Sequence, residues 1–272
     1  MPTAAEPTIQ SIPLTTGVRL LYVEQGNPDG VAVLLLHGYT DSWRSWEPVL
    51  PYIPDTIHAF APTQRGHGDA ERPPAGYGPH DFAADAAAFV DALGIGPVVI
   101  VGTSMGSIVA QRFAIDYPER TRGLVLVAAA TTWRTPAALE LWEVVSTLED
   151  PIDPNFVREF QESTLAQPVP PAFVNSVVAE SLKVPARVWR AALREGHLEA
   201  NLAAELGAIQ APTLIVAGDR DAIHPRSEQA SLAAAIPGAQ LLVYPEAGHA
   251  LHWEEPARFA ADLVAFCECL AD

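Results

Sequence analysis

A glycine-flanked serine is the residue pattern with the clearest chemical potential in this 272-residue chain. The stretch Gly102-Thr103-Ser104-Met105-Gly106 follows an apolar run at 98–101, which predicts a strand buried on both faces, and precedes a segment at 107–115 that predicts a helix. A sharp turn between the two leaves room only for hydrogen at positions 102 and 106. It would hold the Ser104 hydroxyl in strained geometry at the carboxyl edge of a sheet, beside a helix N-terminus. The alternative interpretation of this stretch is a glycine-flanked serine in an ordinary strand-to-helix turn, without a catalytic role.

A serine hydroxyl is a poor nucleophile unless a histidine takes its proton and an acid orients that histidine. Two later apolar runs, at 213–217 and 240–244, predict strands that end in loops carrying such groups. The first loop is Gly218-Asp219-Arg220-Asp221, and the second contains Gly248-His249. Because the loops after parallel strands emerge at one edge of a sheet, a serine, an aspartate and a histidine can converge there.

The elements that must position these groups alternate along the chain. Residues 1–12 look like a loose arm that enters a first strand, and further strands are expected at 18–23, 31–36, 56–61, 98–101 and 123–128. Helices are expected at about 46–52, 80–93 and 107–115. This alternation predicts an α/β protein with a mostly parallel central sheet and helices on both faces.

The alternation stops at Thr131. From there to about Leu206 the sequence shows only helical segments, several beginning near a proline, expected at 136–148, 154–164, 170–182, 185–194 and 197–206. Strands then resume at 213–217 and 240–244, with helices at 227–235 and 256–270. We therefore expect a core formed by residues 1–130 and 207–272, with a helical cap at 131–206 inserted in it.

The composition of the chain argues against several classes of binding partner. The formal charge of −17 argues against nucleic acid and anionic membrane surfaces, and it says little about a neutral small-molecule substrate, which is the partner we expect. We expect no membrane insertion and a cytoplasmic protein, because no signal peptide or membrane-spanning apolar stretch is visible. Cys267 and Cys269, two apart on an expected helix, would point about 200° away from each other, so neither a disulfide nor a metal site is expected. No cofactor is implied, since the serine turn lacks the glycine spacing and lysine of a phosphate loop.

Five sequence motifs, taken together with their order along the chain, resemble those of the α/β-hydrolase superfamily, in its capped, esterase-like branch. They are Gly102–Gly106, His37-Gly38-Tyr39, Arg65-Gly66-His67-Gly68, Gly218–Asp221 and Gly248-His249, and the resemblance covers nearly the whole chain. The serine, acid, histidine order also matches that superfamily. One departure is Thr63, where relatives commonly carry an acidic residue two before the arginine. Because that loop is largely structural, we expect no loss of activity.

The resemblance implies a catalytic set. Ser104 would be the nucleophile and His249 the general base, with Asp221, three residues after the glycine, orienting the histidine. Asp219 is the competitor for that role. The backbone N–H groups of Tyr39 and Met105 would form the oxyanion hole.

The remaining aromatic residues and histidines have less defined roles. Trp133, Trp142, Leu251 and Trp253 are expected to line the substrate pocket, although such aromatic side chains also hold helices together. Four more histidines, at positions 58, 80, 197 and 224, have no visible constellation around them. His37 and His67 are expected to fix loops, and His252 to be structural rather than to face the cavity.

These features predict a serine hydrolase that cleaves a carboxylic ester or lactone of a small, fairly hydrophobic substrate through an acyl-enzyme. Cleavage of a carbon–carbon bond in a diketone product of aromatic breakdown is the main alternative. A ligand receptor and a cofactor-free oxygenase on the same fold are others. The serine at position 104 disfavours epoxide hydrolases and haloalkane dehalogenases, which use an aspartate there.

Overall fold

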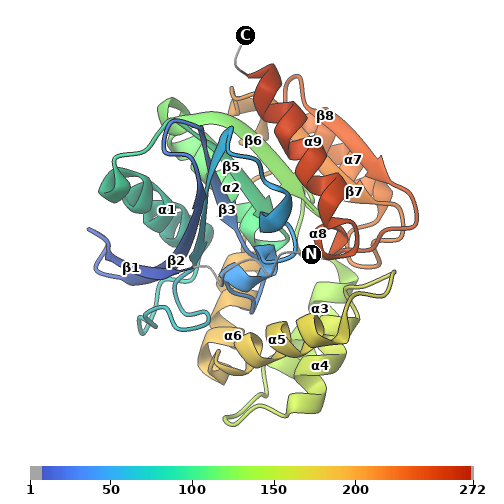
Figure 1. The fold of residues 1–272 in the computed structure, drawn as a ribbon. Helices are drawn as coiled ribbons and strands as arrows, with labels where there is room; N and C mark the ends of the chain where they lie inside the picture. Colours follow the sequence, from blue (N-terminus) through green and yellow to red (C-terminus); the bar gives the residue numbers. More distant parts are fainter. Residues whose placement is uncertain (1–7, 271–272) are drawn as a thin grey trace.

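A computed structural model describes residues 8–270 and shows an eight-stranded sheet with the strand order β1-β2-β4-β3-β5-β6-β7-β8 (Figure 1). The strands β3 to β8 run parallel to one another, while β1 and β2 are antiparallel to their neighbours. Their bounds are β1 Ile9–Pro13, β2 Arg19–Gly26, β3 Val31–Leu36, β4 Ile57–Thr63, β5 Val98–Thr103, β6 Thr121–Val127, β7 Thr213–Gly218 and β8 Gln240–Tyr244. The fold class predicted from the sequence is confirmed.

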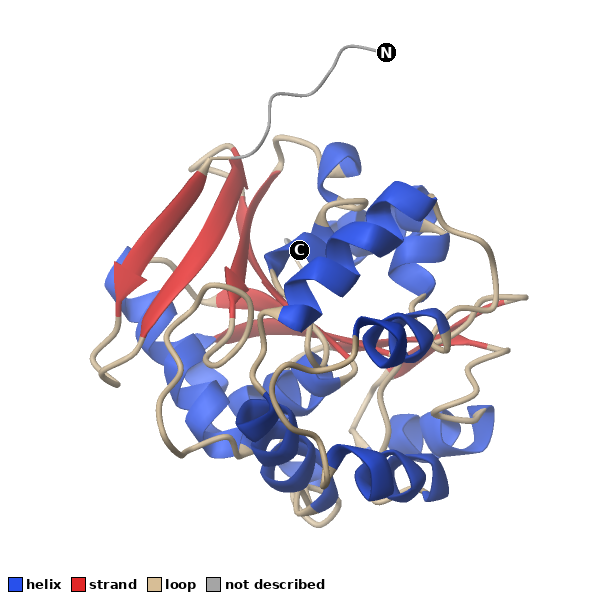
Figure 2. Ribbon diagram, turned by 90° about the horizontal axis from the view of Figure 1, so that it is seen from below, coloured by secondary structure: helices blue, strands red, loops and turns tan. Residues whose placement is uncertain are grey.

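The central strands are mostly apolar because both of their faces are buried. Along β5, Ile100 packs into the core on one face of the sheet, whereas Val99 and Val101 pack into the core on the other. Helices α1 (Pro79–Leu93), α2 (Met105–Asp116) and α7 (Arg226–Ala235) contribute to the first core, and α8 (Leu251–Glu254) and α9 (Pro256–Cys269) to the second. Figure 2 shows helices on both sides of the strands.

The register brings the functional loops together. Leu36, the last residue of β3, pairs with Gly102 of β5, and Gly102 pairs with Leu126 of β6. Further along the sheet, Gly218 at the end of β7 pairs with Tyr244 at the end of β8. The loops that follow β3, β5, β7 and β8 therefore begin at the same edge of the sheet, as ligand-binding loops do in parallel sheets.

Four helices between β6 and β7 gather below the sheet in Figure 1. They are α3 (Pro136–Val145), α4 (Pro154–Glu162), α5 (Pro171–Leu182) and α6 (Ala186–Leu193), and we call residues 131–206 the α3–α6 segment. Three of them begin with proline, which needs no hydrogen-bond acceptor in the first turn. Thr135 and Asp153 cap α3 and α4 by accepting backbone N–H groups.

Two expected helices are not formed. In place of a helix at 46–52 there are two short 3₁₀ turns, Trp43–Trp46 and Leu50–Tyr52, because Pro48 and Pro51 lack the N–H that a continuous helix requires. In place of a helix at 197–206, α6 runs into a π-type turn at Arg194–Leu198, and a 3₁₀ turn follows at Leu206–Ala208.

Two smaller sequence expectations concern cysteines and membranes. On α9, Cys267 is buried, Cys269 is exposed, and both are free thiols. Within residues 8–270, no helix combines the length and apolar character needed to cross a bilayer.

Candidate active site

The turn between β5 and α2 holds Ser104 in a strained conformation. Its φ of 49° and ψ of −120° lie outside the regions that most L-residues adopt. A Cβ atom on Gly102 would lie 2.1 Å from the carbonyl oxygen of Gly106, and one on Gly106 would lie 2.3 Å from that of Leu36. Both glycines are therefore required for the close approach of backbone to backbone that forms this turn.

A histidine and a carboxylate meet at the ends of β7 and β8. Nδ1 of His249 lies 2.9 Å from Oδ2 of Asp221. The other carboxylate oxygen, Oδ1, accepts the backbone N–H groups of Ile223 and His224 at 2.8 and 2.9 Å. Asp219 is exposed, and its Oδ1 accepts the N–H of Glu246 instead. The aspartate that contacts the histidine is thus Asp221.

Electrostatics keep Asp221 charged. Burial by itself would raise the pKa of this carboxyl, but the charge and hydrogen bond of His249, together with the N–H of His224, outweigh burial and lower the pKa. An ionised carboxylate only accepts hydrogen bonds, so Nδ1 of His249 carries the proton and Nε2 is the nitrogen free to accept one.

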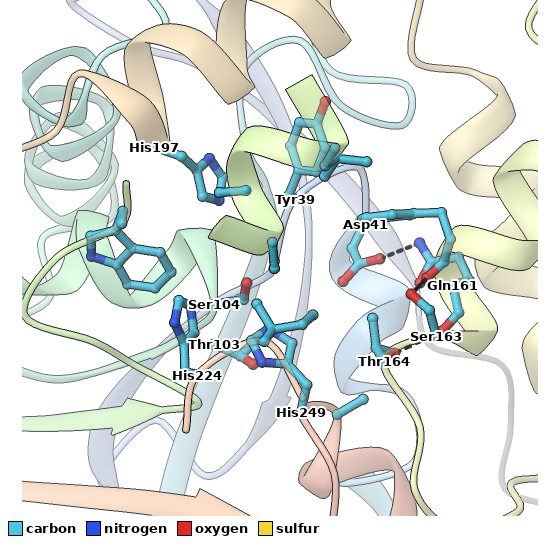
Figure 3. A pocket seen from close by; sticks show the side chains of 18 of the residues that line it. Tyr39, Asp41, Thr103, Ser104, Gln161, Ser163, Thr164, His197, His224 and His249 are labelled. Carbon is cyan, nitrogen blue, oxygen red and sulfur yellow. Dashed lines mark hydrogen bonds between the residues drawn. The ribbon is translucent and has the colours of Figure 1, made fainter. Parts of the chain in front are cut away.

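Ser104 and His249 line the same cavity, which has a volume of about 200 Å³ (Figure 3). Among the described residues, the structure records no hydrogen bond between the Ser104 hydroxyl and His249. Catalytic hydrogen bonds are often long or misaligned in free enzymes and tighten when substrate binds. The arrangement therefore places a serine hydroxyl and an imidazole in one cavity, with the imidazole held by its contact with Asp221.

Two backbone N–H groups come from the loops around Ser104. Met105 is the first residue of α2, so its N–H has no acceptor within the helix. Tyr39 follows Gly38, where a Cβ atom would lie 3.5 Å from Cβ of Ser104. The Tyr39 hydroxyl donates to the carbonyl oxygen of Trp189 at 2.7 Å, so its side chain anchors this loop to α6.

The cavity walls are largely apolar and come from both the core and the α3–α6 segment. Of the four residues expected in the substrate pocket, Trp133 and Trp253 line the cavity. Trp142 and Leu251 do not: Trp142 is half-buried beside Leu141, which lines the cavity instead. Leu251 is fully buried in the core under α9. On a helix, neighbouring residues point about 100° apart, so the pocket prediction missed by one residue at 142.

Several polar residues of the cavity were not assigned to it from the sequence. They include Asp41, which follows β3, Gln161 on α4, and the two histidines His197 and His224. Burial lowers the pKa of His197 to about 4 and that of His224 to about 3, with the charge of His249 acting in the same direction, so both rings are neutral at pH 7. The position of Asp41, two residues after Tyr39 in the same loop, was the sequence signal that could have indicated it.

Burial gives Asp41 an unusual titration. The residue is 5% exposed, and burial raises the pKa of its carboxyl to about 7, although hydrogen bonds from Gln161 and Ser45 partly offset this shift. Asp41 is therefore close to half-protonated near neutral pH.

Three further histidines make structural contacts. Nδ1 of His37 lies 2.8 Å from the carbonyl oxygen of Gly38, and its Nε2 accepts the N–H of Gln64 at 2.9 Å. Nδ1 of His67 lies 2.8 Å from the carbonyl oxygen of Arg65. Nε2 of His252 lies 3.2 Å from the Ser45 hydroxyl, although His252 also borders the cavity, contrary to the sequence expectation. Within the described ranges, no three His, Cys, Asp or Glu side chains are grouped so as to hold a metal ion.

A comparison with known protein families identifies the family of this chain. Residues 31–256 match the family described as the alpha/beta hydrolase fold. The chain belongs to the α/β-hydrolase family. The resemblance predicted from the five motifs is confirmed.

Similar proteins in this family differ in the reactions for which they are named. A putative carbamate hydrolase, RutD, from Variovorax paradoxus is 33% identical over 91% of this chain and 95% of its own length. A 2-hydroxymuconate semialdehyde hydrolase from Pseudomonas sp. is 29% identical over 91% of this chain and 90% of its own length. Epoxide hydrolase 1 from Siraitia grosvenorii is 34% identical, but the match spans 56% of this chain and only 48% of that protein.

Among solved structures, a thermophilic esterase from Thermogutta terrifontis is similar over 97% of this α/β-hydrolase and 99% of its own chain. The two share 26% of their residues, with a TM-score of 0.84. The chain is thus a member of the α/β-hydrolase family, and its relatives are named for hydrolysis of different bonds.

Proposed function

We propose that this α/β-hydrolase is a serine hydrolase that cleaves a carboxylic ester or lactone of a small, fairly hydrophobic substrate. The observation that carries the proposal is the 2.9 Å contact between His249 and Asp221, in a cavity that also holds Ser104. The largely apolar walls of that cavity support a hydrophobic substrate. The esterase from Thermogutta terrifontis supports the same reaction class.

In the proposed reaction, Nε2 of His249 takes the proton of the Ser104 hydroxyl as Oγ attacks the substrate carbonyl carbon. The negative charge that develops on the carbonyl oxygen is stabilised by the N–H groups of Tyr39 and Met105. The bond to the alcohol oxygen then breaks, and His249 gives its proton to the leaving alcohol. A water molecule, deprotonated by His249, attacks the acyl group on Ser104, and the acid is released with the free serine.

The α3–α6 segment acts as a cap in this proposal. It contributes Trp133, Leu141 and Gln161 to the cavity, and its backbone at Trp189 accepts the Tyr39 hydroxyl. A cap of this kind removes water from around the substrate and so strengthens the electrostatic stabilisation of the oxyanion.

The proposal is tested with p-nitrophenyl esters of increasing chain length, a lactone and a carbamate. Ser104→Ala should lose at least about 10³-fold in kcat, and a fluorophosphonate should label Ser104 in the unchanged protein. Ser231→Ala, at an exposed position on α7, is the matched control and should keep full activity. Full ester turnover by the Ser104→Ala protein, or no labelling of Ser104, would contradict the proposal.

The second candidate reaction is hydrolysis of a carbon–carbon bond in a vinylogous diketone. The full-length similarity to 2-hydroxymuconate semialdehyde hydrolase favours it. Turnover of such a diketone, followed by its loss of absorbance, would have to exceed turnover of every ester in the panel for this candidate to replace the first.

A further inference from the structure

One end of the active-site cavity carries a buried carboxyl that the proposed reaction does not use. Asp41 borders the cavity, and its Oδ1 accepts Nε2 of Gln161 at 3.0 Å. Its Oδ2 accepts the hydroxyl of Ser45 through a longer bond of 3.3 Å. We call these three residues the Asp41 cluster. Both donors are uncharged, so neither neutralises a carboxylate.

The Asp41 cluster lies beside the reacting serine. A Cβ atom added to Gly38 would lie 3.1 Å from Oδ2 of Asp41 and 3.5 Å from Cβ of Ser104. The side chains of Asp41 and Ser104 therefore border the same small space beside Gly38. Figure 3 shows one carboxyl oxygen of Asp41 bonded to Gln161 and the other directed to the side of the cavity where Ser104 lies. A substrate group attached near the scissile carbonyl would therefore pass next to Asp41.

No cation compensates this carboxyl. Among the ion pairs between described residues, none includes Asp41, and His249 is the titratable group whose charge acts on it. A buried carboxyl without a cation is costly unless further donors reach it, and an ionised carboxylate can accept more hydrogen bonds than Gln161, Ser45 and the backbone N–H of Gly38 supply. A ligand that brings a hydrogen-bond donor to Oδ2 would meet this need.

We propose that Asp41 determines specificity by accepting a hydrogen bond from a hydroxyl or amino group that the substrate carries close to its scissile carbonyl. The proposal rests on the ester hydrolysis proposed above and names the substrate class within it. The raised pKa of Asp41 agrees with a carboxyl that lacks such a donor in the free protein. A substrate without the donor leaves a buried carboxylate beside the oxygen on which negative charge develops, which opposes turnover.

Matched ester pairs provide the test. The first pair is p-nitrophenyl butyrate and its 3-hydroxy and 3-amino analogues, and the second is ethyl and 2-hydroxyethyl butyrate. In the unchanged protein, kcat/KM should favour the donor-bearing member of at least one pair by about tenfold or more. An advantage of the amino ester that grows above pH 7 would identify an ammonium as the preferred donor. An equal advantage of the hydroxy ester would identify a neutral donor.

Asp41→Leu should remove this preference, so that the ratio of kcat/KM within the pair falls about tenfold towards one. A fold-wide defect lowers both members of a pair equally and does not move their ratio. Asp55→Asn, which changes an exposed carboxyl away from the cavity, is the control and should leave the ratio unchanged. An unchanged ratio in the Asp41→Leu protein would overturn the proposal, as would a ratio near one for both pairs in the unchanged protein.

A second measurement is independent of turnover. Calorimetry with the Ser104→Ala protein compares binding of 3-hydroxybutyrate, 3-aminobutyrate and butyrate. Tighter binding of a donor-bearing acid, lost when Asp41→Leu is added, supports the role of Asp41 even if no ester is hydrolysed. Equal or undetectable binding of all three acids, with no ester hydrolysed, rejects it. The proposed function and this inference can therefore fail separately.

Discussion

Oδ2 of Asp221 lies 2.9 Å from Nδ1 of His249, although 28 residues separate them in the chain. Two backbone N–H groups hold the other oxygen of the same carboxylate, so the acid is fixed before it meets the ring. Asp221 therefore fixes both the tautomer and the orientation of the His249 ring.

Asp221→Asn should lower kcat for ester hydrolysis by about 10³- to 10⁴-fold. An asparagine amide can donate to Nδ1, which favours the tautomer in which Nε2 already carries a proton and cannot accept one from Ser104. Steady-state kinetics on a p-nitrophenyl ester measures this loss. Asp219→Asn alters the exposed neighbour and should stay within about twofold of the unchanged protein. A larger loss in Asp219→Asn than in Asp221→Asn would reverse the assignment.

Acid should destabilise the protein through its buried histidines. Burial lowers the pKa of His67 and His197 to about 4 and of His224 and His252 to about 3. Between pH 6.5 and these values, the unfolded chain binds protons that the folded protein cannot bind. The free energy of unfolding should therefore fall by roughly 1.4 kcal/mol per pH unit for each such histidine as the pH decreases.

The titration of Asp41 has the opposite effect on the free energy of unfolding over part of this pH range. Because burial raises its pKa to about 7, the folded protein keeps a proton that the unfolded chain releases, and this contribution to stability grows as the pH falls from 7 towards 4. One carboxyl is outweighed by several histidines below pH 6. Urea unfolding between pH 7 and 4 measures the net slope, and His197→Gln should reduce that slope by about one proton. Stability that rises on acidification below pH 6 would contradict the prediction.

The Arg65-Gly66-His67-Gly68 loop is held by a buried ion pair. Nε and Nη2 of Arg65 each donate to a different oxygen of Asp85 at 2.6 Å, and both side chains are less than 10% exposed. Asp85→Ala should lower the free energy of unfolding by about 3–5 kcal/mol, because it leaves a guanidinium buried without its carboxylate.

Chemical denaturation of this variant measures the loss. The double variant Arg65→Met/Asp85→Leu removes both charges and should be clearly more stable than Asp85→Ala alone. A loss below about 1 kcal/mol in Asp85→Ala would show that water or another acceptor satisfies Arg65.

Much of the fold could be predicted because the local pattern and the tertiary environment agree. The short apolar runs within β3, β5 and β6 favour strands buried on both faces, and the glycines at 102 and 106 allow the close backbone approach of the turn that follows β5. The helix expected at 197–206 shows the limit. There the chain joins α6 to the core, and packing at the junction gives turns rather than a helix.

The candidate site likewise contains residues that could be predicted from the sequence and residues that could not. Ser104, Asp221 and His249 were chosen from the sequence because each follows a strand of the sheet, and strand ends are fixed by the hydrophobic pattern. The contribution of His197 and His224 to the cavity was not predicted, since no local motif indicates which polar residue faces a space enclosed by distant segments. Asp41 was missed although its place in the loop after Tyr39 could have indicated it. Trp142 was placed in the pocket as an aromatic residue of the expected cap, and Leu251 because it lies two residues after His249. Neither observation fixes the direction of a side chain.

The amino-acid sequence by itself determined the family, the parallel sheet and the loops that carry the serine, the acid and the histidine, because strand periodicity and glycine requirements are local properties. Only the tertiary structure decided that Asp221 rather than Asp219 contacts His249, and that Gln161 reaches Asp41 from 120 residues away. The first contact depends on the pairing of β7 with β8, which places their loops side by side, and the second depends on how the α3–α6 segment packs over the edge of the sheet.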